Sequence, residues 1–320
     1  MVTISTTYSE LNKLKYNNSI ITIGSFDGLH LGHKKIFNKM ENLSSKKNID
    51  NNKILITFNP HPVSVLYKNK KNKYYLSESI SKKVELLNSF DSFSIDIIVI
   101  IEFNKEFSLV SASDFFNKII KCFNPTDIVM GHDNGFGYKR EGNINFLKEK
   151  YSKKTFELHV VTPKQDNSQV IISSTLIRNF IQNGKIKKAN MMLGRFYSVK
   201  GKIVKGKGIG KTINFPTINI SPLNKFQITP FSGVYFVHLE IGLNKYIGMC
   251  NIGFNPTITN NKEETIEVHI FRVKTSEDFY GKEVRVFFVE YIREEKKFKN
   301  IDFLAKQLEE DKKYCLSIKV

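Results

Sequence analysis

Apolar runs and helical patterns alternate along the first half of the chain. Compact apolar runs at residues 20–23 and 95–101 predict buried β-strands. Ile36, Met40 and Leu43 recur at helical spacing and predict one face of a helix. Alternating strands and helices predict an α/β, doubly wound parallel sheet, which binds ligands beyond the carboxyl ends of its strands. The other strands predicted in this half are residues 53–58, 127–130 and 156–161, and the other helices are residues 84–90 and 113–121.

The pattern changes after residue 196, where short β-rich runs separated by turn residues predict an antiparallel β-barrel. A helix that opens at Ser173 and is closed by Gly184 precedes this region, and a helix over residues 301–313 follows it. We therefore expect a parallel-sheet domain over residues 1–184, and a barrel domain with a C-terminal helix over residues 185–320. The predicted barrel strands are residues 197–204, 233–241, 245–251, 265–273 and 283–291.

A glycine-bearing turn follows the strand at residues 20–23 and leads into a helix expected to begin near Leu29. The N-terminus of a helix binds phosphate, because its N–H groups lack partners and its dipole is positive there. His30 and His33, three positions apart, lie on one face of the first helical turn. They are suited to donate hydrogen bonds to phosphoryl oxygens as charge develops in a transition state. The alternative is two incidental surface histidines.

Two further segments support a phosphate site. Arg178 stands near the start of a predicted helix, where the helix dipole disfavours a cation. An anion bound there would explain the presence of this arginine. Ser174 and Thr175 are also ordinary helix-capping residues, and a hydrogen bond to a loop would serve Arg178 equally well. The glycine-rich loop 131–137 follows a predicted strand and so belongs to the ligand-binding edge of the sheet, although such a turn needs no function.

The second candidate site is a polar strand face in the barrel region. Thr217 and Asn219 project from one face of a strand predicted over residues 215–219. A hydroxyl and an amide there are suited to Mg²⁺ and phosphate oxygens, and an ordinary polar strand face is the alternative. Glu267 and His269 share a polar face in the same way, and a carboxylate is able to take a proton from a substrate hydroxyl.

Residues 205–212 resemble a Walker A loop but fail its spacing. That motif requires four residues between its first glycine and the Gly-Lys pair, whereas Gly206 and Gly210 are separated by three. No helix is predicted after the loop either. This excludes a P-loop nucleoside triphosphatase, while the glycines still allow backbone N–H groups to approach phosphates.

Composition bounds the remaining functional classes. At 320 residues, 41% of them apolar, the chain is long enough for two globular domains. The net charge of +18 suggests nucleic acid, but 43 of the 49 basic residues are lysines spread along the chain, which favours a solvated surface instead. Three scattered cysteines lack metal-like spacing and suit a reducing cytoplasm. The polar N-terminus predicts no signal peptide, and the longest apolar run, residues 97–101, is too short for a membrane helix.

The first candidate site resembles the adenylyltransferase module of the prokaryotic bifunctional riboflavin kinase/FAD synthetases, over residues 21–33, 131–137 and 172–178. The resemblance implies attack of the FMN phosphate on the α-phosphorus of ATP, with release of pyrophosphate. It implies that His30 and His33 stabilise the pentavalent phosphorus and that Asp133 helps to place FMN. The implied ATP-binding residues are Gly24, Phe26, His30, His33, Ser174, Thr175 and Arg178, the last three holding the β- and γ-phosphates.

The barrel region is similar to the riboflavin kinase module of the same family, and the resemblance spans residues 20–311 in all. The matching kinase segments are residues 193–197, 212–220, 233–235, 251–253, 256–257, 266–270, 278–282 and 292–293. The resemblance implies that Thr217 and Asn219 bind Mg-ATP, with Thr217 on the metal. It implies that Glu267 is the base that activates the ribityl 5′-hydroxyl of riboflavin, and that Arg293 contacts the flavin.

The chain departs from the family pattern at several positions. Asn134 replaces an aromatic residue in the substrate loop of the first module, which bears on flavin stacking there. None of the kinase departures removes a proposed catalytic group, and Ile218 is expected to point away from the face that carries Thr217. The kinase departures are Phe196 for Pro, Lys211 for Arg, Asn214 for Gly and Ile218 for Ala.

The sequence thus predicts a cytoplasmic bifunctional enzyme that phosphorylates riboflavin to FMN and then adenylylates FMN to FAD, using ATP and Mg²⁺. Its predicted partners are the small molecules riboflavin, FMN and ATP, with no nucleic acid and no membrane. The alternative, motivated by Asn134, is a chain that retains only the kinase activity and carries a degenerate first module. The sequence makes no prediction of oligomeric state.

Overall fold

In the computed structural model the chain forms two compact units, Met1–Ser174 and Thr175–Val320. The second unit includes nearly all of α6 (Ser174–Gln182), whose Ile181 carbonyl accepts a hydrogen bond from the Phe231 N–H at 3.1 Å. The sequence-based boundary after residue 184 lies beyond this helix, and which activity α6 serves stays a prediction. The residues described are 1–47, 51–66, 75–76, 79–90, 92–151, 155–206, 210, 213–256, 262–273 and 279–318.

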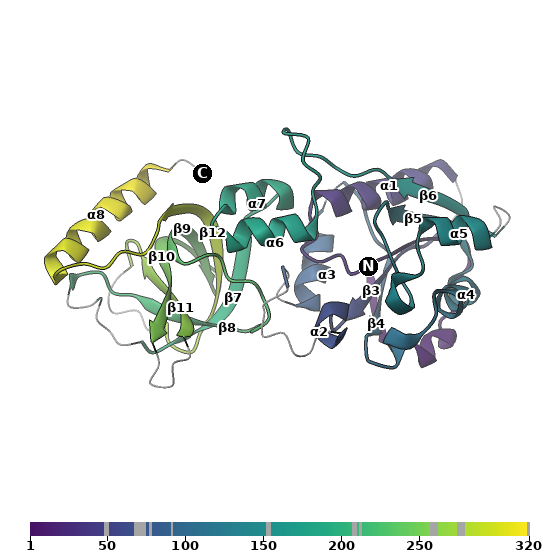
Figure 1. Ribbon diagram of the computed structural model, residues 1–320, viewed down its shortest axis with the longest axis horizontal. Helices are drawn as coiled ribbons and strands as arrows, with labels where there is room; N and C mark the ends of the chain where they lie inside the picture. Colours follow the sequence, from purple (N-terminus) through teal and green to yellow (C-terminus); the bar gives the residue numbers. More distant parts are fainter. Residues whose placement is uncertain are drawn as a thin grey trace. The chain divides into compact units, whose positions relative to one another are not determined.

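The first unit is built on a six-stranded sheet whose neighbouring strands all run parallel (Figure 1). The strand order is β1–β4–β3–β2–β5–β6. Since β3 and β5 flank β2 on opposite sides, the switch point of this doubly wound sheet lies at the carboxyl end of β2. The strands are β1 (Val2–Thr6), β2 (Ser19–Ile23), β3 (Lys53–Asn59), β4 (Ile97–Glu102), β5 (Pro125–Gly131) and β6 (Glu157–Val161).

Alternate residues of the strands supply two separate cores, one on each face of this sheet. On one face Ile21 and Ile23 pack in a cluster with Phe115 of α4. On the other face Ile20 packs in a cluster with Phe37 of α1. Helices therefore cover both faces, as the sequence predicts. The helices of this unit are α1 (Leu31–Lys47), α2 (Pro62–Leu66), α3 (Ile80–Asn88), α4 (Ala112–Phe123) and α5 (Ile144–Lys150).

The second unit is a closed barrel of six strands whose neighbours all run antiparallel, in the order β10–β11–β8–β7–β12–β9 (Figure 1). Fully buried residues such as Ile252, Val268 and Val286 face its interior. The elements are α7 (Ile186–Leu193), β7 (Tyr197–Val204), β8 (Ile218–Pro222), β9 (Gly233–Ile241), β10 (Asn244–Pro256), β11 (Lys262–Ile270), β12 (Glu283–Arg293) and α8 (Ile301–Ser317).

Helix α8 packs against the outside of the barrel. Its Cys315 is fully buried in an apolar cluster with Phe236 of β9 and Met249 of β10. Asn251 stands two positions after Met249, so it lies on the same outer face of β10. Helix α8 therefore packs on the side of the barrel on which the kinase candidates lie.

The predicted fold class is confirmed, with local differences at the ends of elements. Helix α1 begins at Leu31 because Phe26 and Leu29 have left-handed backbones, with φ of 46° and 39°. The strand predicted over residues 215–219 begins only at Ile218, since Pro216 lacks an N–H for the ladder. None of the helices within the described ranges is long and apolar enough to cross a membrane.

Two candidate active sites

The first candidate site is the turn between β2 and α1, at the switch point of the sheet. Asp27 in this turn is 4% exposed, and both of its carboxylate oxygens lie 3.1 Å from the Leu76 N–H that donates to them. The Asp27 carbonyl accepts a hydrogen bond from the Ser174 hydroxyl at 2.9 Å. Gly28 has φ of 78°, and a Cβ there would lie 2.7 Å from the Leu76 side chain. The turn is therefore held on two sides and requires glycine at position 28.

His30 and His33 form a stacked pair where this turn enters α1. Their ring centres are 3.7 Å apart with 17° between the planes, and the His33 N–H donates to the His30 carbonyl at 2.9 Å. Phe26 and His33 pack edge to face, with ring centres 5.3 Å apart. A Cβ at Gly24 would lie 3.2 Å from the Phe26 ring, so the turn is closely packed. The structure thus brings Gly24, Phe26 and both histidines together, as the phosphate-site hypothesis requires.

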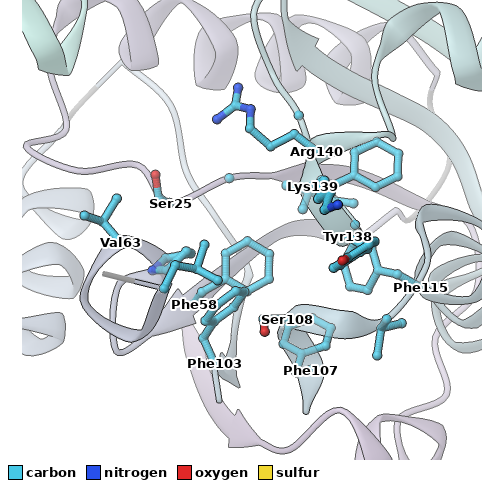
Figure 2. Close-up of a pocket in the computed structure, with 18 of the residues that line it drawn as sticks. Ser25, Phe58, Val63, Phe103, Phe107, Ser108, Phe115, Tyr138, Lys139 and Arg140 are labelled. Atoms are coloured by element: carbon cyan, nitrogen blue, oxygen red, sulfur yellow. The ribbon is translucent and has the colours of Figure 1, made fainter. Parts of the chain in front are cut away.

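A cavity of about 710 Å³ lies beside this turn, and Gly24 and Ser25 line it (Figure 2). Cavities of this size bind small molecules, and they are mostly lined by apolar and aromatic side chains with a few polar groups. This cavity has that character, since aromatic rings line much of it. The aromatic lining residues are Phe58, Phe103, Phe107, Phe115, Phe136 and Tyr138.

The loop after β5 closes one side of this cavity. Asn134, which departs from the family pattern, donates from its side-chain amide to the Ile23 carbonyl at 2.5 Å and lines the cavity. Asn134 thus ties the loop to the end of β2, while the aromatic lining comes from Phe136 and Tyr138 of the same loop and from rings on other elements. The Asp133 side chain is 75% exposed, with its carboxylate 3.8 Å from the His132 imidazole, and Asp133 is not among the described residues that line the cavity. Its contact with FMN stays a prediction.

Lys83 of α3 is a buried cation beneath the turn that the sequence did not single out. It is only 7% exposed, and its ammonium donates to the Ser25 carbonyl at 2.6 Å and to the Thr57 hydroxyl at 3.1 Å. Burial lowers the pKa of Lys83 to about 8, and the Asp27 carboxylate offsets part of this effect. A lysine within a predicted helix is normally expected at the surface, so only the three-dimensional contacts reveal that Lys83 is buried beneath the turn.

The helix start at residues 173–178 falls on both sides of the boundary between the two units. Ser174 belongs to the first unit and uses its hydroxyl on the Asp27 carbonyl, so it holds the turn in place. Thr175 and Arg178 belong to the second unit. Their phosphate contacts stay a prediction from the resemblance.

The second candidate site is a row of polar side chains on three adjacent barrel strands. Glu267 of β11 pairs directly with Asn219 of β8 on one side and with Asn251 of β10 on the other. Residues that pair directly project from the same face, with Cβ atoms about 4.5–5.5 Å apart. The Asn251 amide donates to the Glu295 carboxylate at 3.1 Å. The two predicted residues Asn219 and Glu267 are therefore neighbours, and Asn251 joins them.

Thr217 lies in the irregular segment just before β8. The imidazole Nδ1 of His269 lies 2.9 Å from the Pro216 carbonyl, and its ring lies 4.9 Å from that of Phe215. Burial lowers the pKa of His269, so the neutral ring is favoured, and it anchors the segment that carries Thr217. His269 shares the outer face with Glu267, as predicted, and its role there is to hold this segment.

Two glycines allow the backbone before β8 to pass close to this row. A Cβ at Gly206 would collide with the Asn219 amide, and one at Gly210 would collide with the Phe215 carbonyl. Such close backbone approach is typical of segments that present N–H groups to phosphate. Among the residues singled out from the sequence, Lys211, Thr257 and Asp278 lie outside the described residues.

Arg293 forms a forked ion pair with Asp311 of α8. Its Nε and Nη2 donate to the carboxylate at 3.0 and 2.7 Å, and its Nη1 donates to the Glu294 carbonyl at 2.9 Å. Asp311 is 3% exposed, so this pair is largely removed from water. The Arg293 side chain is thus engaged in holding α8, and its flavin contact stays a prediction.

Thiol chemistry has no support at either site. The three cysteines are free and buried. Burial, with the nearby Glu267 carboxylate adding to it, raises the pKa of the Cys250 thiol and keeps it protonated. Within the described ranges, one group of side chains has metal-ligand character, Asp127, Glu157 and His159 on β5 and β6. Asp127 stands near the amino end of β5 and already pairs with His159 at 2.9 Å.

One unit carries a turn with a stacked histidine pair, and the barrel of the other carries a carboxylate between two asparagines, which is the arrangement expected of an ATP-dependent transferase with two active sites. The FAD synthetase family model matches residues 12–176, and the riboflavin kinase model matches residues 193–319. The chain therefore belongs to the family of bifunctional riboflavin kinase/FMN adenylyltransferases. Because both models match, two activities are favoured over the kinase alone.

Individual relatives agree with this assignment. A bifunctional riboflavin kinase/FMN adenylyltransferase of Buchnera aphidicola subsp. Acyrthosiphon pisum is 37% identical over 92% of this chain and 91% of its own length. Its counterpart in Bacillus subtilis is 32% identical over 99% of this chain and 98% of its own. The crystal structure of a macrolide-efflux protein from Streptococcus pneumoniae has 28% identity and a TM-score of 0.86, and the alignment covers 100% of both chains, so the two share a fold.

Proposed function

We propose that the chain phosphorylates riboflavin to FMN and then transfers AMP from a second ATP to FMN, giving FAD and pyrophosphate. One observation carries the proposal: each unit holds its own constellation, His30 with His33 at a phosphate-binding turn, and Glu267 beside Asn219 on the barrel. The two reactions follow each other chemically, because the product of the first is the acceptor in the second.

In the kinase reaction, Glu267 takes the proton of the ribityl 5′-hydroxyl as its oxygen attacks the γ-phosphorus of ATP, and ADP leaves. The direct pairing of Glu267 with Asn219 supports this proposal, because the proposed base then lies one strand away from the proposed nucleotide-binding residues. Thr217 and Asn219 offer a hydroxyl and an amide oxygen, which are ligands that Mg²⁺ and its phosphates accept. When bound, Mg²⁺ neutralises phosphate charge and orients the γ-phosphate. Arg293 is proposed as a flavin contact on the strength of the resemblance alone.

In the adenylyl transfer, a phosphate oxygen of FMN attacks the α-phosphorus of ATP and pyrophosphate leaves. The flavin ring is proposed to occupy the aromatic cavity beside Gly24 and Ser25, which would direct its phosphate toward the turn. His30 and His33 donate hydrogen bonds to the charged phosphoryl oxygens of the transition state. Gly24 and Phe26 shape the turn, Asp133 helps to place FMN, and Ser174, Thr175 and Arg178 hold the β- and γ-phosphates.

Small molecules are the proposed partners of this protein: riboflavin, FMN, and ATP with Mg²⁺. We assign no role to nucleic acid or membrane, since the surplus of positive charge is carried by lysine spread along the chain. A cytoplasmic location is proposed from the three buried, unpaired cysteines, which suit a reducing compartment.

Two substitutions test the division of labour. Glu267→Gln keeps the shape of the side chain but removes the base, so FMN formation should be lost while supplied FMN is still converted to FAD. His30→Ala should let FMN accumulate without FAD. In each variant the activity of the unaltered unit serves as the control, because it shows that the chain is folded. Loss of both activities from either folded variant would contradict the assignment of two separate sites.

A further inference from the structure

The aromatic cavity of the first unit cannot by itself tell FMN from riboflavin. The two molecules share the same ring system and ribityl chain and differ only in the terminal phosphate. Rings such as Phe58, Phe103 and Phe107 contact what the two share, so they bind both. Selection of the phosphorylated flavin requires a positive group at the end of the cavity where the phosphate lies.

The described residues that line this cavity include the cations Lys139 and Arg140, and none of those described carries a carboxylate. The cavity is therefore lined by cations without nearby acidic lining groups to neutralise them. Since Gly24 and Ser25 also line the cavity, it extends to the turn at which the phosphate of FMN has to meet ATP.

Lys139 and Arg140 both hold a left-handed backbone, with φ of 50° and 62°. For residues with a Cβ this conformation costs about 1–2 kcal/mol each, so the surrounding structure has to enforce it. The enforcing contacts are present: Phe136 and Gly142 exchange two backbone hydrogen bonds of 2.9 Å, and the Tyr138 N–H donates to the Val110 carbonyl at 2.8 Å. A strained backbone that surrounding hydrogen bonds hold in place is typical of functional positions.

The two cations of this loop are used differently. The ammonium of Lys139 lies 5.1 Å from the centre of the Tyr138 ring. Arg140 Nη2 donates to the Asp133 carbonyl at 3.0 Å, and no ion pair to a carboxylate is found for Arg140 among the described residues. A Cβ at Gly135 would lie 2.9 Å from Arg140 Nε, so glycine makes room for this side chain. Figure 2 shows the Arg140 side chain extending toward the side on which Ser25 lies.

We propose that Arg140 is the specificity-determining residue that recognises the 5′-phosphate of FMN and selects it over riboflavin. A guanidinium presents five N–H donors in a fixed fork, of which the bond to Asp133 uses one, so the others are left for phosphate oxygens. A phosphate monoester carries about −1.5 to −2 charge at neutral pH, which suits a site with cations and no carboxylate. This inference rests on the proposed function of the first unit.

The test is steady-state conversion of FMN to FAD by the full chain, with lumiflavin as a competitive inhibitor. Lumiflavin has the flavin ring but no ribityl chain or phosphate, so it reports ring binding alone and the kinase cannot phosphorylate it. Arg140→Gln should raise KM for FMN by about 10- to 100-fold, the effect of losing a charge-assisted hydrogen bond. The inhibition constant of lumiflavin should stay within about twofold, and Arg140→Lys should be intermediate because it keeps the charge.

Two further variants make the result decisive. Arg140→Gly accepts the left-handed backbone without strain, so a selective loss of FMN binding in both the Gln and Gly variants excludes misfolding. Lys148→Gln removes an exposed cation of α5 outside the cavity and should leave KM for FMN unchanged. An unchanged KM in Arg140→Gln, or a parallel rise in the lumiflavin constant, would overturn the assignment. Absence of FAD from the wild-type chain would instead overturn the proposed function, and this inference with it.

Discussion

Replacing Lys83 by Met tests the buried lysine beneath the turn between β2 and α1. In the folded protein the pKa of Lys83 is about 8, against its usual 10.5, because burial disfavours the charged ammonium. Between these two values the unfolded chain binds a proton that the folded chain has released. Stability therefore rises with pH across this window.

The size of this effect follows from the two pKa values. A folded value of about 8 and an unfolded value of 10.5 correspond to a rise of roughly 2.5 kcal/mol in the free energy of unfolding between pH 7 and pH 10. Methionine at position 83 does not titrate, so the variant lacks this contribution. The free energy of unfolding of the wild type, minus that of Lys83→Met, should therefore increase by about this amount between pH 7 and pH 10.

The assay is urea unfolding at several pH values, read by pulse proteolysis and mass spectrometry. Peptides from Met1–Ser174 report the first unit separately from the second. Groups that titrate alike in the wild type and the variant contribute equally to both free energies of unfolding, so their contributions cancel in the difference. At neutral pH the variant should also lose FMN adenylylation, because the Ser25 and Thr57 oxygens lose their donor, while riboflavin phosphorylation is retained. A stability difference that does not change with pH would show that the pKa of Lys83 is not lowered in the folded protein.

Two other substitutions probe the second unit. Arg293→Gln leaves the Asp311 carboxylate buried without its partner and should cost about 3–5 kcal/mol, seen as lost hydrogen-exchange protection in α8. Adding Asp311→Asn removes the unpaired charge and should recover part of the lost stability. If no stability is recovered, the broken ion pair is not the cause of the loss. Gly206→Ala should push the new methyl group into the Asn219 amide and raise KM for ATP in the kinase reaction. FMN adenylylation by the same variant should be unchanged, and an unaltered KM for ATP would show that the close approach has no function.

The fold class could be predicted from the sequence because its strongest signals, apolar runs and helical spacing, are local and periodic. The apolar run at residues 20–23 lies in β2 and most of the run at residues 95–101 lies in β4, and the change of pattern near residue 196 marks the start of the barrel. Helix α7 (Ile186–Leu193) was missed, because its short sequence lies next to the predicted domain boundary. Strand β1 (Val2–Thr6) was missed as well, since it lies within a polar N-terminus.

The candidate sites were predictable where a motif lies on one short segment. Phe26, His30 and His33 come from a single turn, so their proximity follows from spacing. Lys83 acts through Ser25 and Thr57, which are remote in sequence, and no local pattern distinguishes it from the many surface lysines. The cavity likewise draws its rings from several elements, so the loss of one aromatic residue at the Asn134 position says little about flavin binding.

Both reactions can be followed in order on one sample of the purified protein. It is incubated with riboflavin, ATP and Mg²⁺, and the flavins are separated by chromatography over time. We expect FMN to appear first and FAD to follow as FMN is consumed. FMN that never becomes FAD would contradict the function proposed for the first unit, and no phosphorylated flavin at all would contradict the functions proposed for both units.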